Sequence, residues 1–182
     1  MRKRSTGSAK TTATSATLAR VDTTMSTESA QCWICMGDAC TEEVVRPCRC
    51  PREAHPKCLA RWQLYRAGKA EESTCRFCGD KLPDWRPALT PGEVDSSLSG
   101  AVMAVKLNGM EHRITVTPGA DGRKQFESDI RRLFDLSSED DLEYSFDCID
   151  PLNSDVGVVL EGRGAFDAAF HCAAVTAAKR RR

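Results

Sequence analysis

Apolar and polar residues alternate in the second half of the chain in a way that predicts a β-hairpin. Residues 101–107 alternate along one strand, and the turn signal Asn108-Gly109 follows directly. The spacing continues on the return strand, so that one face of the hairpin carries Met103, Val105, Leu107, Ile114 and Val116. We therefore predict two antiparallel strands joined by a two-residue turn.

Helical spacing replaces this alternation after the hairpin. Residues 123–136 predict a helix whose apolar face carries Phe126, Ile130, Leu133 and Phe134. Strands are predicted around 143–149 and 156–160, and a last helix over 165–178. The order ββαββα predicts a small α+β domain in which a sheet packs on helices.

A further helix is predicted over residues 57–67. Pro56 suits a first helical turn, and Gly68 suits a stop. Cys58, Trp62 and Tyr65 share one face at i, i+4 and i+7. Trp62 is therefore either a core residue or a partly exposed anchor for a partner, and its spacing leaves both open.

Composition divides the rest of the chain. Residues 1–30 contain thirteen Ser or Thr and only two acids, which predicts disorder, although such a composition also suits an organelle transit peptide. A Pro-, Gly- and Ser-containing linker is predicted over 87–100. We expect a disordered tail (1–30), a cysteine-rich module (31–86), the linker, an α+β domain (101–178) and a basic tail (179–182).

Charge and hydropathy exclude several classes of protein. The chain has 26 basic and 26 acidic side chains, which argues against a nucleic-acid-binding or anionic-membrane-binding protein. Arg46 to Arg86 nevertheless holds ten basic residues against five acids, so a basic module facing an acidic partner is one interpretation and a solvated surface is the other. No run approaches 18 apolar residues, which predicts no membrane span.

Eight Cys and His residues form four close pairs, and this is the strongest chemical signal. Both members of a pair one or two residues apart can bind one ion, and structural Zn²⁺ takes four thiolate or imidazole ligands. The pairs are Cys32/Cys35, Cys48/Cys50, His55/Cys58 and Cys75/Cys78. We expect two Zn²⁺ ions, each supplying about 10 to 16 kcal/mol to a module too small to fold by apolar burial alone.

The spacing leaves the pairing of these ligands open. An interleaved fold joins the first pair with the third and the second with the fourth, whereas a sequential fold joins neighbouring pairs. Reduced thiolates favour the cytoplasm or nucleus over a secretory compartment, and organelle import is the less favoured alternative. Disulfides would contradict the metal interpretation.

The residues around these ligands resemble the RING-CH (RING-variant) zinc finger family. The resemblance rests on Cys32-Trp33-Ile34-Cys35, on Cys48-Arg49-Cys50, and on the run from His55 to Trp62. It implies an interleaved cross-brace and ubiquitin-ligase activity. It also implies that Ile34 and Trp62 bind a ubiquitin-loaded conjugating enzyme, with no catalytic residue in this chain.

Three departures keep a second interpretation open. Only four residues separate Cys50 from His55, Arg76 stands where many RING domains have proline, and Gly79 stands where an arginine often follows the last ligand. The short gap is closer to PHD fingers, which share the ligand order. The alternative function is thus a non-enzymatic PHD-like peptide reader or a scaffold or adaptor.

The C-terminal domain weakly resembles the ubiquitin-like β-grasp, including the Phox-Bem type of interaction domain. Lys106 and an acidic group of Asp147, Asp150 and Asp155 suit that type, although a solvated acidic loop accounts for them equally well. This domain would bind an unknown protein substrate or scaffold. The remaining cysteines and histidines are expected to be ordinary core, strand or helix residues: Cys40, His112, Cys148, His171 and Cys172. Cys40 is also the one that could replace a zinc ligand.

Overall fold

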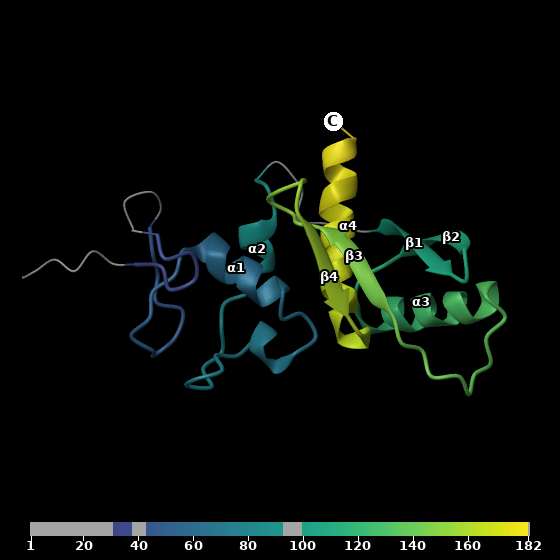
Figure 1. The fold of residues 1–182 in the computed structure, drawn as a ribbon, viewed down its shortest axis with the longest axis horizontal. Coiled ribbons are helices and arrows are strands. Elements are labelled where there is room, and N and C mark those ends of the chain that lie inside the picture. Colours follow the sequence, from purple (N-terminus) through teal and green to yellow (C-terminus); the bar gives the residue numbers. More distant parts are fainter. Residues whose placement is uncertain (1–30, 38–42, 93–99, 182) are drawn as a thin grey trace, which may run out of the picture.

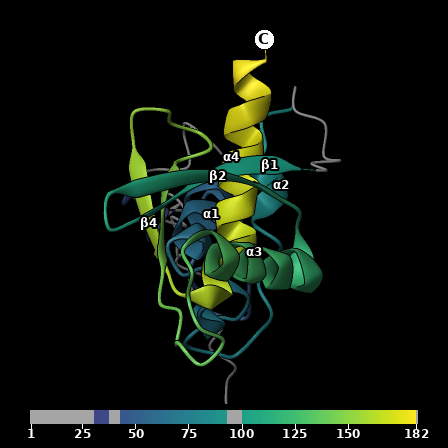
Figure 2. The same ribbon diagram turned by 90° about the vertical axis from the view of Figure 1, so that its right-hand side faces the viewer.

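Helix α4 (Phe166–Arg180) is the centre of the C-terminal half, because two β-hairpins pack against it. The computed structural model describes residues 31–37, 43–92 and 100–181. In Figure 1 the cysteine-rich module lies at one end of the molecule, α3 (Gly119–Leu133) and the first hairpin lie at the other, and α4 stands between them. Figure 2, turned by 90°, shows α4 passing behind the first hairpin. None of the described helices is long and apolar enough to cross a bilayer.

The first hairpin forms as the sequence predicts. Strands β1 (Ala101–Leu107) and β2 (Met110–Val116) pair antiparallel, with Val105 opposite His112. Asn108 has φ 49° and Gly109 has φ 82°, so both turn residues are left-handed, as a type I′ turn requires. Ile114 and Val116 are buried, so the alternation does mark the inner face.

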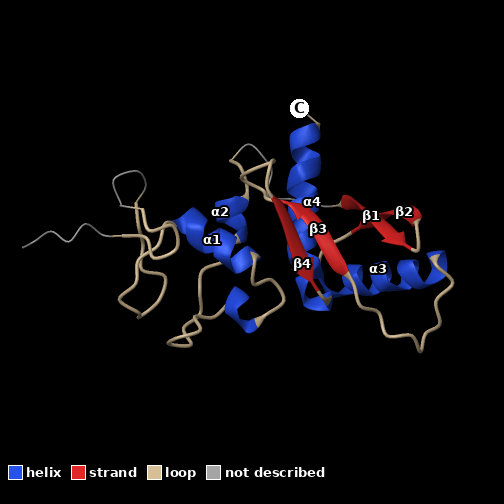
Figure 3. Ribbon diagram, viewed as in Figure 1, coloured by secondary structure: helices blue, strands red, loops and turns tan. Residues whose placement is uncertain are grey.

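The second hairpin consists of β3 (Ser145–Ile149) and β4 (Gly157–Glu161), which also pair antiparallel. The observed order β1–β2–α3–β3–β4–α4 confirms the expected ββαββα order and the α+β class. The β-grasp resemblance is not confirmed, because the two hairpins are separate two-stranded sheets, whereas a β-grasp has a single sheet. Figure 3 shows the two red pairs lying on different sides of α4.

Helix α3 (Gly119–Leu133) begins four residues earlier and ends three residues earlier than predicted. Pro118 immediately precedes it in extended conformation, so the helix begins as soon as the proline allows. Phe134 is the residue that caps its C-terminus, and Asp135 then adopts φ 51°. The buried side chains of α3 include Phe126 and Ile130, as the helical spacing predicts.

The cysteine-rich module contains little regular structure. Figure 3 shows it mostly as loop around α1 (Pro56–Leu64), the 3-10 turn η1 (Ala70–Glu72) and the short helix α2 (Arg86–Leu89). The most buried face of α1 is not the predicted Cys58, Trp62 and Tyr65 face. It carries instead Leu59, Ala60, Gln63 and Leu64.

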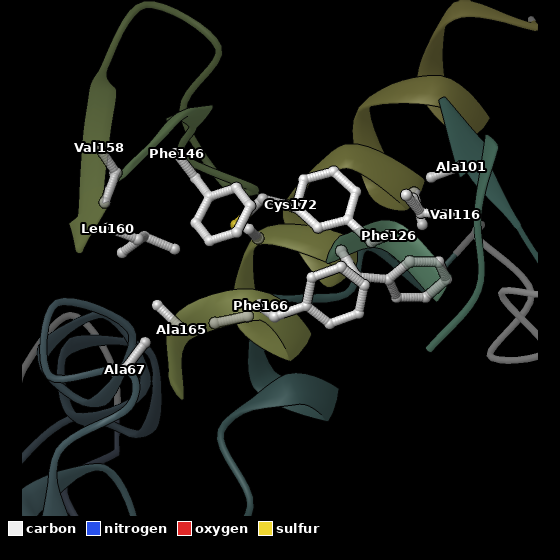
Figure 4. Close-up of a cluster of buried hydrophobic side chains, with 14 of the residues drawn as sticks. Ala67, Ala101, Val116, Phe126, Phe146, Val158, Leu160, Ala165, Phe166 and Cys172 are labelled. Carbon is white, nitrogen blue, oxygen red and sulfur yellow. The ribbon is translucent and has the colours of Figure 1, made fainter. Parts of the chain in front are cut away.

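One hydrophobic core accounts for that difference, because it crosses from the cysteine-rich module into the C-terminal half. Ala60 and Leu64 of α1 and Ala67 belong to the same buried cluster as Phe146 and Phe166. Figure 4 shows Ala67 beside Ala165, which is the last residue of the 3-10 turn η2 (Arg163–Ala165) and immediately precedes α4. Leu89, in the segment expected to be a linker, is also fully buried in this cluster.

Two further contacts join the halves. The edge of His171 on α4 packs on Trp85 at a ring-centroid distance of 5.1 Å. The backbones of Gly68 and Gly164 touch so closely that a Cβ on Gly68 would lie 2.7 Å from the carbonyl carbon of Gly164. The joint between the halves is thus a packed interface.

The acidic group expected of a Phox-Bem domain is not a solvated cluster. Asp150 is fully buried and forms an ion pair with Arg61 of α1, whereas Asp147 and Asp155 are exposed. Lys106 pairs with Glu111 across the first hairpin. Asp150 therefore serves the joint between the halves and is not available to a partner.

Candidate metal centre

The eight ligands gather into two clusters in the described structure. One consists of Cys32, Cys35, His55 and Cys58, and the other consists of Cys48, Cys50, Cys75 and Cys78. The first pair thus joins the third and the second joins the fourth, which is the interleaved arrangement. The sequential alternative is wrong. We call these clusters site 1 and site 2.

The donor distances fit tetrahedral zinc. Sulfur ligands at about 2.3 Å and a nitrogen at about 2.0 Å from Zn²⁺ would lie about 3.8 Å (S to S) and about 3.5 Å (N to S) apart. In site 2 the Cys50 and Cys75 Sγ atoms are 3.9 Å apart. In site 1 His55 Nδ1 lies 3.4 Å from Cys35 Sγ and 3.7 Å from Cys58 Sγ. All four donor atoms of each site lie within 4.8 Å of one another, so both sites fit a zinc ion.

Two similar turns bring paired cysteines together. In the first knuckle, residues 32–37, the N–H of Met36 donates to the Cys32 carbonyl at 2.8 Å. In the second knuckle, residues 75–80, the N–H of Gly79 donates to the Cys75 carbonyl at 2.9 Å. Met36 and Gly79 have φ of 59° and 73°, so in each knuckle the backbone reverses directly after the second cysteine. The two sulfurs of each turn consequently face the same site.

An ion pair holds the two halves of site 2 together. Arg49 stands between the ligands Cys48 and Cys50, and its Nη2 lies 2.7 Å from Asp80 Oδ1. The backbone N–H of Arg49 also donates to Asp80 Oδ2 at 2.9 Å. These contacts lower the pKa of the Asp80 carboxyl to about 2. Asp80 follows the last ligand by two residues, so it fixes the second knuckle to the Cys48–Cys50 loop.

Helix α1 positions site 1. His55 is the residue before the helix and Cys58 lies in its first turn, so the start of α1 sets the separation of two ligands. His55 Nδ1 faces the sulfurs, whereas the buried Nε2 has no hydrogen-bond partner in the described chain. The backbone N–H of His55 lies 3.5 Å from Cys32 Sγ, to which it donates. Nδ1 is therefore the nitrogen that would bind zinc.

Two sulfurs of site 1 have pKa values shifted in opposite directions. Burial raises the pKa of Cys32, but N–H groups of Cys35, His55 and Ile34 donate to its sulfur, and the net effect is a pKa of about 6. Burial and the neighbouring sulfurs raise the pKa of Cys58 to about 12. Zinc binds thiolates, so a divalent cation would offset the burial and the neighbouring sulfurs that raise the pKa of Cys58.

In site 2, as in site 1, one cysteine has a lowered pKa and another has a raised pKa. The pKa of Cys75 falls to about 7, because N–H groups of Cys78 and Phe77 outweigh burial. Hydrogen bonding to Cys78, together with burial, raises the pKa of Cys50 to about 12. Four sulfurs this close suit a bound cation and leave no reason to assign any of them to nucleophilic chemistry.

The two expected partner-binding residues lie beside the sites and are partly buried. Ile34 and Trp62 both pack on a small cluster formed by Cys32, Ala54 and Leu59. Neither is fully enclosed, so each leaves part of its side chain at the surface.

An aromatic pocket that the sequence pattern did not single out lies next to Trp62. Trp33 and Phe77, one from each knuckle, line it together with Arg52 and Arg76. Trp33 meets Trp62 edge-on at 5.9 Å, and Phe77 is 54% exposed. An aromatic residue inside each Cys-x-x-Cys pair was the signal that could have identified them. We call the pocket lined by Trp33, Arg52, Trp62, Arg76 and Phe77 the aromatic pocket.

The remaining cysteines and histidines of the described chain belong to neither cluster. Cys172 is buried on α4, Cys148 is half-buried against the same core, and His112 packs edge-on against Phe134. Cys40, considered as a substitute ligand, lies outside the described residues.

Comparison with known proteins agrees with this geometry. Residues 32–78 match the RING-variant domain family, and the match begins and ends at the first and last ligands described above. The chain matches no curated protein and no solved structure. Residues 32–78, with their two interleaved Cys/His clusters, are therefore a RING-variant domain.

Proposed function

We propose that this protein is a RING-type ubiquitin ligase, which docks a ubiquitin-loaded conjugating enzyme and promotes transfer of ubiquitin to a substrate. The observation that carries the proposal is the position of Ile34 and Trp62. Both lie on one small apolar cluster at site 1, and both are partly exposed. The RING-variant family commonly binds such enzymes through these positions.

The chain's own residues would act by positioning. Zinc with four protein ligands has no open coordination position, so it would supply rigidity and no reaction chemistry. Ile34 and Trp62 would hold the conjugating enzyme, and its thioester would be presented to an acceptor lysine in a restricted set of orientations. No side chain of this protein needs to attack the thioester.

The C-terminal half would hold the substrate or a scaffold. Because its core is continuous with that of α1, a substrate bound there would keep a fixed position relative to the RING-variant domain. Reduced thiolates at both sites fit a cytoplasmic or nuclear location.

An autoubiquitination assay with a panel of conjugating enzymes tests the proposal. We expect activity with at least one enzyme, and we expect Trp62→Ala to reduce it at least about tenfold while native mass spectrometry still finds two zinc ions. Tyr65→Ala is the matched control, since Tyr65 is an exposed aromatic residue on the turn after the same helix. It should retain activity.

A non-enzymatic adaptor or peptide reader is the second candidate. Arg76 and Gly79 favour it, because they stand where active RING domains often carry proline and arginine. A chain that binds two zinc ions yet shows no activity across the panel would exclude the ligase and favour the adaptor.

A further inference from the structure

Two arginines of the aromatic pocket stack on an exposed ring and have no carboxylate partner in the described part of the chain. The Arg52 guanidinium carbon lies 4.1 Å from the centre of the Phe77 ring, and that of Arg76 lies 5.0 Å from it. Arg52 also lies 5.9 Å from the Trp33 ring. Neither arginine forms an ion pair within residues 31–37, 43–92 and 100–181, and both are exposed.

Neighbouring arginines of the module differ in this respect. Arg46 pairs with Glu53 at 3.0 Å, and Arg49 pairs with Asp80 at 2.7 Å. Their charges are thus balanced within the chain. Arg52 and Arg76 flank the pocket with their charges unbalanced by any described carboxylate, and each guanidinium lies over the Phe77 ring in a cation–π contact. An arginine held in this way loses little side-chain freedom when it binds a carboxylate.

The pocket is continuous with the docking surface of the proposed function. Trp62 lines the pocket and also packs on the cluster that supports Ile34. A protein seated on Ile34 and Trp62 would therefore also cover Phe77 and its two arginines. Its apolar contact would meet Trp33 and Phe77, and its edge would meet two positive charges.

We propose that the aromatic pocket selects conjugating enzymes that carry Asp or Glu in the loop that contacts the RING-variant domain. Arg52 and Arg76 form charge-assisted hydrogen bonds with those carboxylates while Phe77 contacts the adjacent apolar residue. This inference rests on the proposed ligase function, since it names the class of enzyme that the same surface accepts.

Two different roles for the arginines fit the structure less well. Arginine beside aromatic rings also suits single-stranded nucleic acid, but such sites follow a backbone with many cations. Here the neighbouring cations Arg46 and Arg49 are already paired, and the chain has no net charge. The arginines could instead only offset the negative charge of the zinc-thiolate clusters, in which case their loss would affect zinc content and not the choice of partner.

The test is a binding measurement that does not depend on ubiquitin transfer. The full chain, verified to hold two zinc ions, is titrated by calorimetry with conjugating enzymes grouped by the charge of their RING-contacting loop. We expect acidic-loop enzymes to bind at least about tenfold more tightly than neutral or basic ones, and the advantage to shrink between about 0.05 M and about 0.3 M salt.

Substitutions then assign the preference. Arg52→Gln and Arg76→Gln should each remove most of the advantage and keep both zinc ions. Lys69→Gln removes an exposed charge of the same module outside the pocket and should leave the preference unchanged. An Arg76→Glu chain should regain affinity for an enzyme whose loop acid is replaced by arginine.

Four results would overturn the inference. The first is equal affinity for conjugating enzymes with acidic and with basic loops. The second is a preference for acidic loops that survives both Gln variants. Either result would overturn the inference and leave the ligase proposal standing. Single-stranded RNA that binds the wild type and is lost from both Gln variants would assign the pocket to nucleic acid instead. Failure of the two-zinc wild type to bind any conjugating enzyme would overturn both proposals.

Discussion

Arg61 Nε lies 2.7 Å from Asp150 Oδ2, and this ion pair links α1 of the RING-variant domain to the end of β3. The Asp150 side chain is completely buried, whereas that of Arg61 remains 37% exposed. The other carboxylate oxygen accepts from the N–H groups of Leu152 and Asn153, at 2.8 and 3.1 Å. One side chain thus fixes both the β3–β4 turn and the joint between the halves.

Arg61→Ala should destabilise the whole chain, because it leaves a buried carboxylate without its cation. We expect the free energy of unfolding to fall by about 2 kcal/mol, which is below the usual cost of breaking a buried pair since Arg61 is partly exposed. Urea unfolding of the zinc-loaded chain measures this. Lys69→Ala, an exposed cation outside the joint, should change it by less than about 0.5 kcal/mol. Equal effects of the two substitutions would contradict the role of the pair.

Zinc removal should disorder the C-terminal half as well as the RING-variant domain. Ala60 and Leu64 of α1 belong to the core that covers α4, so loss of α1 would expose that core. Hydrogen exchange should show faster exchange of α4 amides after chelation. The idea of a shared core fails if α4 stays protected while the ligand segments exchange freely.

Cys48→Ser should abolish binding at site 2 and unfold the RING-variant domain, since each structural zinc contributes an amount comparable with the whole stability of a typical domain. Native mass spectrometry should find at most one zinc ion. Cys148→Ser, a change of a cysteine outside both clusters, should retain two. An unchanged chelator-sensitive melting profile for Cys48→Ser would refute this assignment.

Gly68→Ala should separate the two halves. Its φ is 79°, and an added Cβ would meet the backbone of Gly164 at 2.7 Å, where nothing can rotate away. Gly109→Ala is a matched control, because Gly109 has φ 82° but open space around its Cβ position. We expect a loss of about 2 to 4 kcal/mol for the first and about 1 kcal/mol for the second, measured by urea unfolding. Similar losses would mean that only backbone strain matters.

His171 should make stability depend on pH. Burial, with a smaller effect of Arg86 that Asp84 opposes, lowers the pKa of His171 from 6.5 to about 4. Between these pH values the unfolded chain binds a proton at His171 that the folded chain does not. The contribution of His171 to the free energy of unfolding is therefore complete above pH 6.5 and is lost as the pH falls to about 4.

The comparison with His171→Phe isolates this effect from acid release of zinc, which both chains share. Phenylalanine keeps an aromatic ring against Trp85 and cannot titrate. The wild type should therefore lose stability relative to the variant as the pH falls through that range. A constant difference between the two unfolding free energies would show that His171 does not titrate differently on folding.

Local patterns predicted the elements and the ligands because their causes are local. The Asn108-Gly109 turn needs only two residues that tolerate positive φ, and a Cys-x-x-Cys pair needs only a tight turn. The interleaved pairing of the ligands depends on chain crossings, so spacing left it open. Tertiary packing decided it.

The joint escaped prediction for the same reason. Asp150 looked like part of a solvated acidic group, and nothing near it in the sequence indicates Arg61, which lies 89 residues away. The buried face of α1 was missed because Ala60 and Leu64 belong to the core that also covers the distant helix α4. The need for glycine at positions 68 and 164 likewise becomes evident only in the folded structure, where the two backbones are in close contact.

The continuity of the core has a consequence for the life of the protein in a cell. A chain synthesised when zinc is scarce would lack α1 as a cover, and Phe146, Phe166 and their neighbours would face water. Such a chain is a target for chaperones and proteases. We therefore expect the steady-state amount of this protein to follow the zinc supply, independently of whatever the folded form binds.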